Sequence, residues 1–198
     1  MTDWKKIQIV LLGAAAALSA TAADVALTNG SFEKGTGGYW INRPAVARVD
    51  STDSTDGKQC LAIEPTEGKR VDIVQGVNLV PGEIYTATFD ARTTEAEGGP
   101  QLVMEIMLQG AAKPIQFFYA NADQKKLMTT PAKLTDGWQT LTYQLGPFPE
   151  KAQGQDVKKI MFYWRVKPGD KPGKLFLDNI KITTAPASEE AGQKKIEK

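Results

Sequence analysis

The sequence of 198 residues contains no histidine and a single cysteine, and its charges almost balance. The absence of histidine excludes Ser-His-Asp and Cys-His catalysis, HExxH zinc sites and histidine general bases. One cysteine excludes an internal disulfide and a cysteine-rich zinc site. With 24 Lys and Arg against 23 Asp and Glu and no basic cluster, nucleic acid is not the expected partner. What remains is a binding protein, or an enzyme that uses carboxylates alone.

The N-terminus has the pattern of a secretory signal peptide. Two lysines precede an apolar run over residues 7–18, and small residues follow at 19–22. This order predicts a signal over residues 1–22 that is cleaved after Ala22, and a mature protein that is secreted or periplasmic with no membrane span. A membrane anchor or a buried helix is the alternative, although the run is short for a bilayer. Cleavage leaves equal numbers of basic and acidic residues, so no charge draws the mature protein to DNA or anionic lipid.

In the rest of the chain, apolar and polar residues mostly alternate with a period of two, which indicates strands. Segments rich in Val, Ile, Thr, Phe and Tyr end at turns that contain Gly, Pro, Asn or Asp. The fold class we predict is all-β, an antiparallel β-sandwich or jelly roll in one domain over residues 23–184. The polar tail over residues 185–198 is expected to be disordered or a frayed helix. The predicted strands are Val71–Val80, Ile84–Arg92, Gln101–Gln109, Ile115–Tyr119, Gln139–Leu145, Lys158–Val166 and Lys174–Thr183.

Several of these strands have one apolar face and one mixed face. In 160–166 the apolar set contains Phe162 and Trp164, and Tyr163 and Arg165 lie on the other side. Such strands are expected to be half buried. The mixed faces suit a sugar-binding groove and an ordinary solvated sheet equally well. Cys60, within an apolar run, is expected to be a buried and inert thiol.

Three segments in order carry a family resemblance. They are LTNGSFE at 27–33, DGKQCLAI at 56–63 and LFLDNIKI at 175–182, with VPGEIYT and GWQ between them. Together they resemble the carbohydrate-binding modules of the family 4, 9 and 22 group (CBM_4_9-like), which are galactose-binding-domain-like jelly rolls. The resemblance covers residues 27–183.

The resemblance implies a structural calcium ion at one end of the sandwich. The matching positions are the carboxylates of Glu33, Asp56 and Asp178 with carbonyls of Ser31 and Gln59. Hard oxygen ligands of this kind suit Ca²⁺. Each carboxylate also has an ordinary explanation: a turn at Asp56, bonds to nearby amides at Asp178, and plain surface at Glu33.

The resemblance also implies a groove in which aromatic rings stack on sugars and polar groups bond the hydroxyls. Relatives often have a Trp on the strand before the Pro-Gly turn, whereas residues 68–72 contain no aromatic side chain. Trp138 and Trp164 are expected in the core, and Trp40 under a loop. The candidate ligand residues are Arg70, Asp72, Glu105, Gln109, Phe118, Tyr163 and Arg165.

Three functions fit these patterns. The first is an exported, monomeric, non-catalytic protein that binds poly- or oligosaccharide, alone or beside a separate glycoside hydrolase. The second is a glycan-active enzyme that uses Glu105 and Asp72, because glycoside hydrolysis needs two facing carboxylates. The third is a structural or protein-binding domain without a working groove, which the missing Trp favours, since fold does not determine function.

Overall fold

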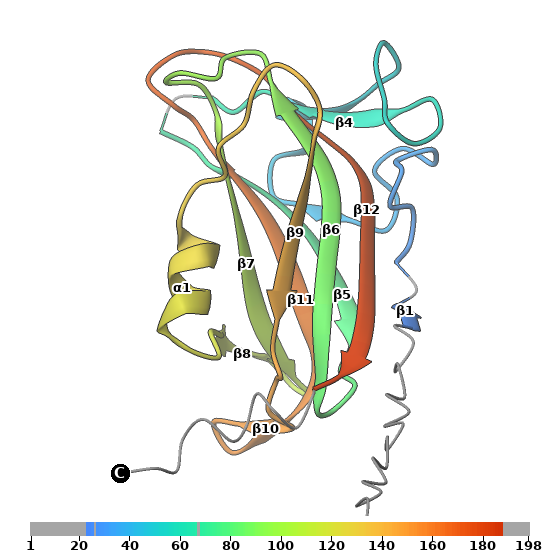
Figure 1. The fold of residues 1–198 in the computed structure, drawn as a ribbon, viewed down its shortest axis with the longest axis vertical. Coiled ribbons are helices and arrows are strands. Elements are labelled where there is room, and N and C mark those ends of the chain that lie inside the picture. The colour runs from blue at the N-terminus through green and yellow to red at the C-terminus, as the bar shows by residue number, and fades with distance from the viewer. Residues whose placement is uncertain (1–22, 26, 67, 188–198) are drawn as a thin grey trace, which may run out of the picture.

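The protein is an antiparallel β-sandwich of two six-stranded sheets (Figure 1). A computed structural model describes residues 23–25, 27–66 and 68–187; the predicted signal at 1–22 and the tail from 188 onward lie outside these residues. The all-β sandwich expected from the period of two is therefore confirmed. Within the described part of the chain, no helix is both long and apolar enough to cross a bilayer.

Each sheet is assembled from strands that are distant in sequence. We call the first sheet A, with strand order β3-β4-β12-β6-β9 and β1 paired to β12. Sheet B has the order β2-β5-β11-β7-β8, with β10 paired to β11. The strands of sheet A are β1 (Ala23–Val25), β3 (Ala47–Asp50), β4 (Cys60–Ile63), β6 (Glu83–Thr93), β9 (Gln139–Leu145) and β12 (Leu175–Pro186). Those of sheet B are β2 (Trp40–Ile41), β5 (Val71–Asn78), β7 (Gln101–Gly110), β8 (Pro114–Phe117), β10 (Lys151–Ala152) and β11 (Gln155–Lys167).

All seven predicted strands are present, with ends that differ from the predicted ones by at most three residues. The prediction lacked the short strands β1, β2, β3, β4 and β10, because two to four residues hold too little alternation to recognise. The last strand runs to Pro186, beyond the domain boundary expected at 184, and its register shifts between Asp178 and Lys181. That irregularity turns the backbone of Asn179 to a φ of 51°.

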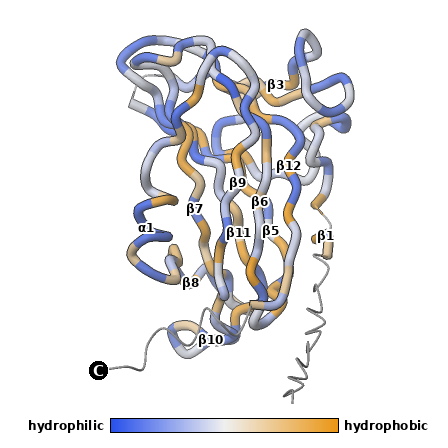
Figure 2. The backbone as a smooth tube through the Cα atoms, viewed as in Figure 1, coloured by the Kyte–Doolittle hydropathy of each residue, from blue (hydrophilic) through white to orange (hydrophobic). Residues whose placement is uncertain are grey.

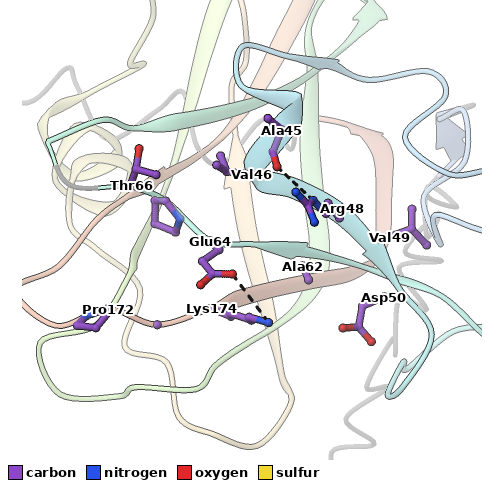
Figure 3. A pocket seen from close by; sticks show the side chains of 12 residues that line it. Ala45, Val46, Arg48, Val49, Asp50, Ala62, Glu64, Thr66, Pro172 and Lys174 are labelled. Atoms are coloured by element: carbon purple, nitrogen blue, oxygen red, sulfur yellow. Dashed lines mark hydrogen bonds and ion pairs between the residues drawn. The ribbon is translucent and has the colours of Figure 1, made fainter.

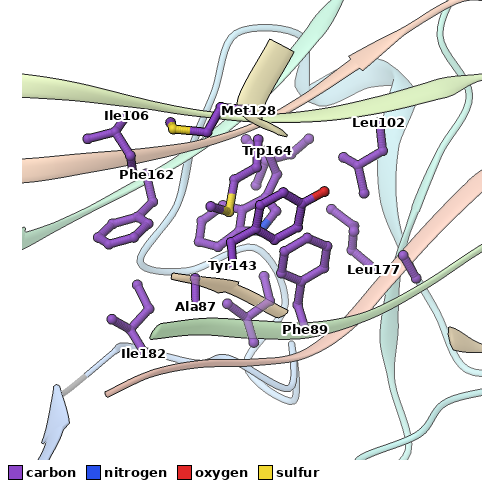
Figure 4. Packing of buried hydrophobic residues seen from close by; sticks show 14 of the residues in the cluster. Ala87, Phe89, Leu102, Ile106, Met128, Tyr143, Phe162, Trp164, Leu177 and Ile182 are labelled. Atoms are coloured by element: carbon purple, nitrogen blue, oxygen red, sulfur yellow. The ribbon is translucent and has the colours of Figure 1, made fainter. Parts of the chain in front are cut away.

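The core lies between the two sheets and is rich in aromatic side chains (Figure 4). Trp164 is fully buried, as expected, and its ring meets Phe89 edge-on at 6.1 Å and Phe162 in a stack at 6.2 Å. Tyr143 stacks on Phe89 from the β9 side. Pairs of this kind contribute about 0.5–1.5 kcal/mol each beyond the apolar area they bury. Hydrophobic residues concentrate in the strands, whereas the loops at the upper end are mostly hydrophilic (Figure 2).

One short helix, α1 (Ala122–Thr129), lies beside β7 in Figure 1. Asn121 caps its first turn by accepting a hydrogen bond from the Gln124 amide at 2.8 Å. Met128 is the side chain that anchors the helix to the core. A helix of eight residues with two buried positions leaves no clear 3.6-residue pattern, which explains why the sequence does not predict it. A 3-10 turn, η1 (Pro44–Val46), precedes β3.

Candidate functional site

The outer face of sheet B gathers six of the seven predicted ligand residues. Side chains alternate along a strand, so those at positions 163 and 165 of β11 point away from the core that Phe162 and Trp164 fill. The antiparallel register then places Tyr163 opposite Glu105 of β7, and Arg165 opposite Asp72 of β5. Arg70 and Gln109 complete the set at opposite ends of this face.

Arg165 is the centre of a charged cluster on this face. Its Nε donates to Asp72 Oδ1 at 2.8 Å, and its Nη1 donates to Glu105 Oε2. Arg70 Nε reaches the other oxygen of Asp72 at 3.3 Å. Arg165 and Asp72 are buried at 7% and 4% exposure, so their charges are compensated by each other and not by water. The cluster has two guanidinium groups and two carboxylates, and it carries no net charge.

Aromatic and sulfur-containing side chains lie next to the charged cluster. Phe117 of β8 meets Tyr163 edge-on at 5.5 Å, and the Arg165 guanidinium lies 5.2 Å from the centre of the Phe117 ring. Trp40 of β2 pairs with Val74 at the opposite edge of the sheet and is 59% exposed. Met161 belongs to the same face, since its sulfur would lie 2.6 Å from a Cβ added at Gly76. We call this row of outer-face side chains the aromatic stripe. Its aromatic members are Trp40, Tyr163 and Phe117, and the apolar side chains of Val74 and Met161 lie on the strands between β2 and β8.

Two expectations about aromatic residues on this face were wrong. Phe118 was predicted to bind ligand, but its ring meets Phe148 at 5.5 Å and packs against the core. Its neighbour Phe117, 39% exposed, takes the outer position because successive side chains of a strand point to opposite faces. Trp40 was expected under a loop and is exposed instead. Pairing with β5 places Trp40 on the outer face, but a two-residue strand gives no sequence pattern from which to predict that pairing.

Two phenols beside the charged cluster hold their protons firmly. Burial raises the pKa of Tyr163, and the negative charge of Asp72 raises it further. Burial also raises the pKa of Tyr119, whose hydroxyl lies 3.5 Å from Glu105 Oε1. Both hydroxyls therefore remain hydrogen-bond donors throughout the neutral pH range. Neutral donors beside ionised acceptors are the groups that bond a polyhydroxylated ligand.

Trp138 departs from the core position expected for it. It lies on the outer face of sheet A and is only partly buried. Its indole N–H donates to Asp53 Oδ2 at 3.0 Å, and the Arg92 guanidinium lies 5.3 Å from its ring centre. Arg92 also covers the ring of Phe176 at 3.9 Å. The position just before a strand gives a side chain no fixed face, so period-two reasoning does not apply to it.

The segment that begins the resemblance is a close-fitting turn against β12. Asn29 adopts a φ of 64°, and its side-chain amide donates to the Gly35 carbonyl at 2.8 Å. The Ile180 amide donates to the Gly30 carbonyl at 2.9 Å, so this segment adjoins the irregular part of β12. Phe32 enters the core with no exposed surface. In this chain the motif NGSFE therefore serves to pack the N-terminal segment against β12 and the core.

The carboxylates predicted to bind calcium accept hydrogen bonds from amides. Glu33 Oε1 accepts from the backbone N–H groups of Lys58 and Gln59 at 2.6 and 2.8 Å. Asp178 is fully buried, and its Oδ2 accepts from the backbone N–H groups of Thr55 and Asp56 at 2.7 and 3.0 Å. Asp178 Oδ1 accepts from the Asn179 amide. Three segments distant in sequence are joined by these bonds.

This arrangement does not fit a Ca²⁺ shell as it stands. N–H donors point at the oxygens that would have to face the ion, and Asp56 contributes its amide to Asp178. Among the residues the structure describes, no group of three or more His, Cys, Asp and Glu side chains is placed to hold a metal. Ser31 is partly buried in the turn just before Phe32. Calcium therefore stays a prediction of the resemblance, and the amide bonds give Glu33 and Asp178 a role without it.

Cys60 has the environment of an inert thiol. Its side chain is completely buried on β4 and forms no disulfide. Burial, followed by the negative charges of Asp50 and Asp178, raises the pKa of the thiol to about 12. Because the thiolate is the reactive form, nucleophilic chemistry at this position is not expected.

The fold and this site were compared with known proteins. A family model described as a carbohydrate binding domain, CBM_4_9, matches residues 25–154. No curated protein matches the sequence. A solved CBM61 module, TmCBM61 in complex with β-1,4-galactotriose, has a TM-score of 0.54 at 13% identity, over 80% of this chain and 97% of that one. The CBM22-1 xylan-binding domain of Paenibacillus barcinonensis Xyn10C has a TM-score of 0.53 at 17% identity, over 85% and 100%.

An enzyme has a similar fold. A Stig cyclase from Fischerella sp. TAU has a TM-score of 0.54 at 13% identity, over 85% of this chain and 100% of the cyclase. At such identities a structural likeness shows the shared fold alone, so it decides nothing between binding and catalysis. The family match is the stronger finding because it covers most of the chain. The jelly-roll fold and the family match agree, and the chain belongs to the CBM_4_9 family of carbohydrate-binding domains.

Proposed function

We propose that this protein is an exported, non-catalytic module that binds a linear polysaccharide along the outer face of sheet B. The observation that carries the proposal is the aromatic stripe beside the neutral cluster of Arg70, Asp72, Arg165 and Glu105. Sugar rings present C–H faces to aromatic rings and hydroxyls to charged groups, and this face offers both. Trp40 and Phe117 lie on the two edge strands of the main sheet order, four strand spacings or about 19 Å apart, so a ligand that touches both spans several sugar rings.

The cluster's geometry favours binding over glycoside hydrolysis. A hydrolase needs the sugar between its two carboxylates, one of them protonated. Here Arg165 occupies the space between Asp72 and Glu105 and bonds to both. The enzymatic alternative requires release of reducing sugar from a glycan that binds. Export follows from the predicted signal over residues 1–22 and is checked by locating the protein in cell fractions.

The binding face is tested with two exposed aromatic residues. Trp40→Ala and Phe117→Ala are each expected to weaken binding about fivefold, because a stacked ring contributes about 1 kcal/mol and 1.4 kcal/mol is a factor of ten. A glycan array on the full chain first selects the oligosaccharide, and titration calorimetry then measures its affinity. Leu127→Ala is the matched control, since Leu127 is 47% exposed on α1 and lines a hollow with Tyr143 of β9, a strand of sheet A.

The outcome of this test separates the three functions. Unchanged affinity in both aromatic variants contradicts binding at this face. Reducing-sugar release that Glu105→Gln abolishes replaces the proposal with the glycosidase alternative. No glycan signal on the array, together with a protein partner in pull-down, favours the protein-interaction alternative.

The calcium prediction has a test of its own. If an ion joins Glu33 and Asp178, EDTA lowers the melting temperature of the full chain and added Ca²⁺ restores it. If amide bonds alone join these segments, the melting temperature does not change once metal analysis shows that no ion remains. Asp178→Ala removes a fully buried acceptor of the Thr55 and Asp56 amides and is expected to destabilise the protein in both cases. Only the EDTA result therefore decides between the two accounts.

A further inference from the structure

A pocket lies on the other side of the sandwich, on the outer face of sheet A (Figure 3). It has a volume of about 580 Å³ and is formed by η1, β3, β4 and the loop between β11 and β12. That volume is in the range of small-molecule sites. Sheets A and B are opposite layers, so a sugar in this pocket cannot touch the aromatic stripe. The pocket therefore needs an explanation separate from the proposed binding face.

The floor of the pocket is apolar for a reason set by the strand register. Arg48 of β3 pairs with Ala62 of β4, which pairs in turn with Phe176 of β12. A small side chain thus lies between two large ones and leaves a hollow. Figure 3 shows Ala62 at this position, with the charged side chains of the pocket arranged around it. Ala45, Val46, Pro65 and Pro172 extend the apolar lining.

Four charged groups surround the floor, and their signs balance. Arg48 Nε donates a hydrogen bond to the Ala45 carbonyl at 3.2 Å, which fixes the guanidinium at the wall of the pocket. Lys174 and Glu64 face each other at 3.9 Å, too far for a hydrogen bond, and both are exposed. Asp50 accepts two hydrogen bonds from Thr52, which lower its pKa and keep it ionised. Two cations and two carboxylates give the pocket lining no net charge.

The wall beside Lys174 is held in place by backbone contacts. The Lys171 amide donates to the Gly98 carbonyl at 2.7 Å. A Cβ at Gly169 would lie 2.1 Å from the carbonyl oxygens of both Gly98 and Gly99, so the two loops touch with no room for a side chain. Thr94 bonds to Lys174 through both its amide and its hydroxyl. A pocket whose wall is already ordered loses little entropy when a ligand binds.

We propose that this pocket is a second saccharide site, which takes one neutral sugar ring at a chain end or branch. The apolar floor faces the C–H surface of the ring, and Arg48, Asp50, Glu64 and Lys174 bond its hydroxyls. A neutral polyol matches this lining because its hydroxyls both donate to carboxylates and accept from cations, whereas a lining without net charge gives no preference for an anion or a cation. With sites on opposite faces, one molecule links two glycan chains.

The experiment is an NMR titration of the full chain with galactose, xylose and glucose and their β-1,4-linked trisaccharides. We expect the backbone amides of Ala62, Gly173 and Lys174 to shift as one group, with a dissociation constant different from that of amides near Tyr163. Ala62→Leu fills the floor and is expected to weaken this binding at least tenfold, with no effect at Tyr163. Ala112→Leu, an exposed alanine in the loop after β7, is the control.

Each result decides something. Shifts near Tyr163 without shifts in the pocket overturn the second site and leave the proposed function standing. Shifts in the pocket alone, blocked by Ala62→Leu, support the second site and contradict the proposed face. Pocket shifts that persist in Ala62→Leu, or no shifts with any of these sugars, overturn the second site. If Ala62→Leu does not fold, Arg48→Met, at an exposed position, takes its place with the same expectation.

Discussion

Replacing Gly30 with alanine is expected to cost about 3 kcal/mol or more of unfolding free energy. The added Cβ would lie 2.1 Å from the Ile180 carbonyl oxygen and 3.2 Å from the carbonyl carbon. These are backbone atoms of β12, and the residues of β12 on either side of Ile180 pair with β1, β4 and β6, which restrains the backbone there. The N-terminal segment would have to withdraw, which breaks the hydrogen bond from the Ile180 amide. Overpacking typically costs about 1–3 kcal/mol and occasionally more, and a clash with backbone atoms places Gly30→Ala at the upper end of that range.

Thermal unfolding of the full chain measures this cost. At 2–4 °C per kcal/mol for a chain of this size, the melting temperature of Gly30→Ala should fall by roughly 6–12 °C. Gly137→Ala is the matched control, because the nearest atom to its added Cβ is 3.9 Å away and its backbone is not in the left-handed region. That variant should change the unfolding free energy by less than about 0.5 kcal/mol. Equal melting temperatures for the two variants would contradict the close fit at Gly30.

The sequence predicted the sandwich because its long strands are each half buried. In β7 and β11 an apolar side alternates with a mixed side over ten or more residues, and the core uses that apolar side throughout. The same alternation is enough to place Glu105 and Tyr163 on the mixed sides of their strands. The order in which strands pair lies beyond such reasoning. Asp72 and Arg165 are 93 residues apart, and only the pairing of β5 with β11 brings them together.

In short strands and next to strand ends, sequence alternation does not predict which face a side chain takes. Trp40 belongs to a strand of two residues and Trp138 precedes a strand, so neither has neighbours that fix its side. The roles of Glu33 and Asp178 were also open, because a carboxylate that faces a cation and one that accepts amide hydrogens are the same residue type. Hydrogen-bond geometry separates these roles, and the donors around Asp178 are N–H and O–H groups.

Arg165→Met is expected to cost about 3–5 kcal/mol of unfolding free energy, because it leaves two facing carboxylates without a counter-charge. Asp72 is 4% exposed and the Glu105 side chain 14%, so water compensates neither charge well. Arg70, with a side chain 55% exposed, reaches only the outer oxygen of Asp72 and cannot replace the lost guanidinium.

A compensated variant separates folding from ligand binding at this cluster. Asp72→Asn and Glu105→Gln, added to Arg165→Met, remove all three charges together and should recover most of the lost stability in urea unfolding. If the cluster also bonds sugar hydroxyls, this stable triple variant should still bind glycan at least tenfold more weakly than the wild type. Full recovery of both stability and affinity would show that the cluster supports the sheet alone, and that the aromatic stripe binds without it. Loss of affinity in a variant that has regained its stability places Arg165 and its two carboxylates in contact with the bound chain.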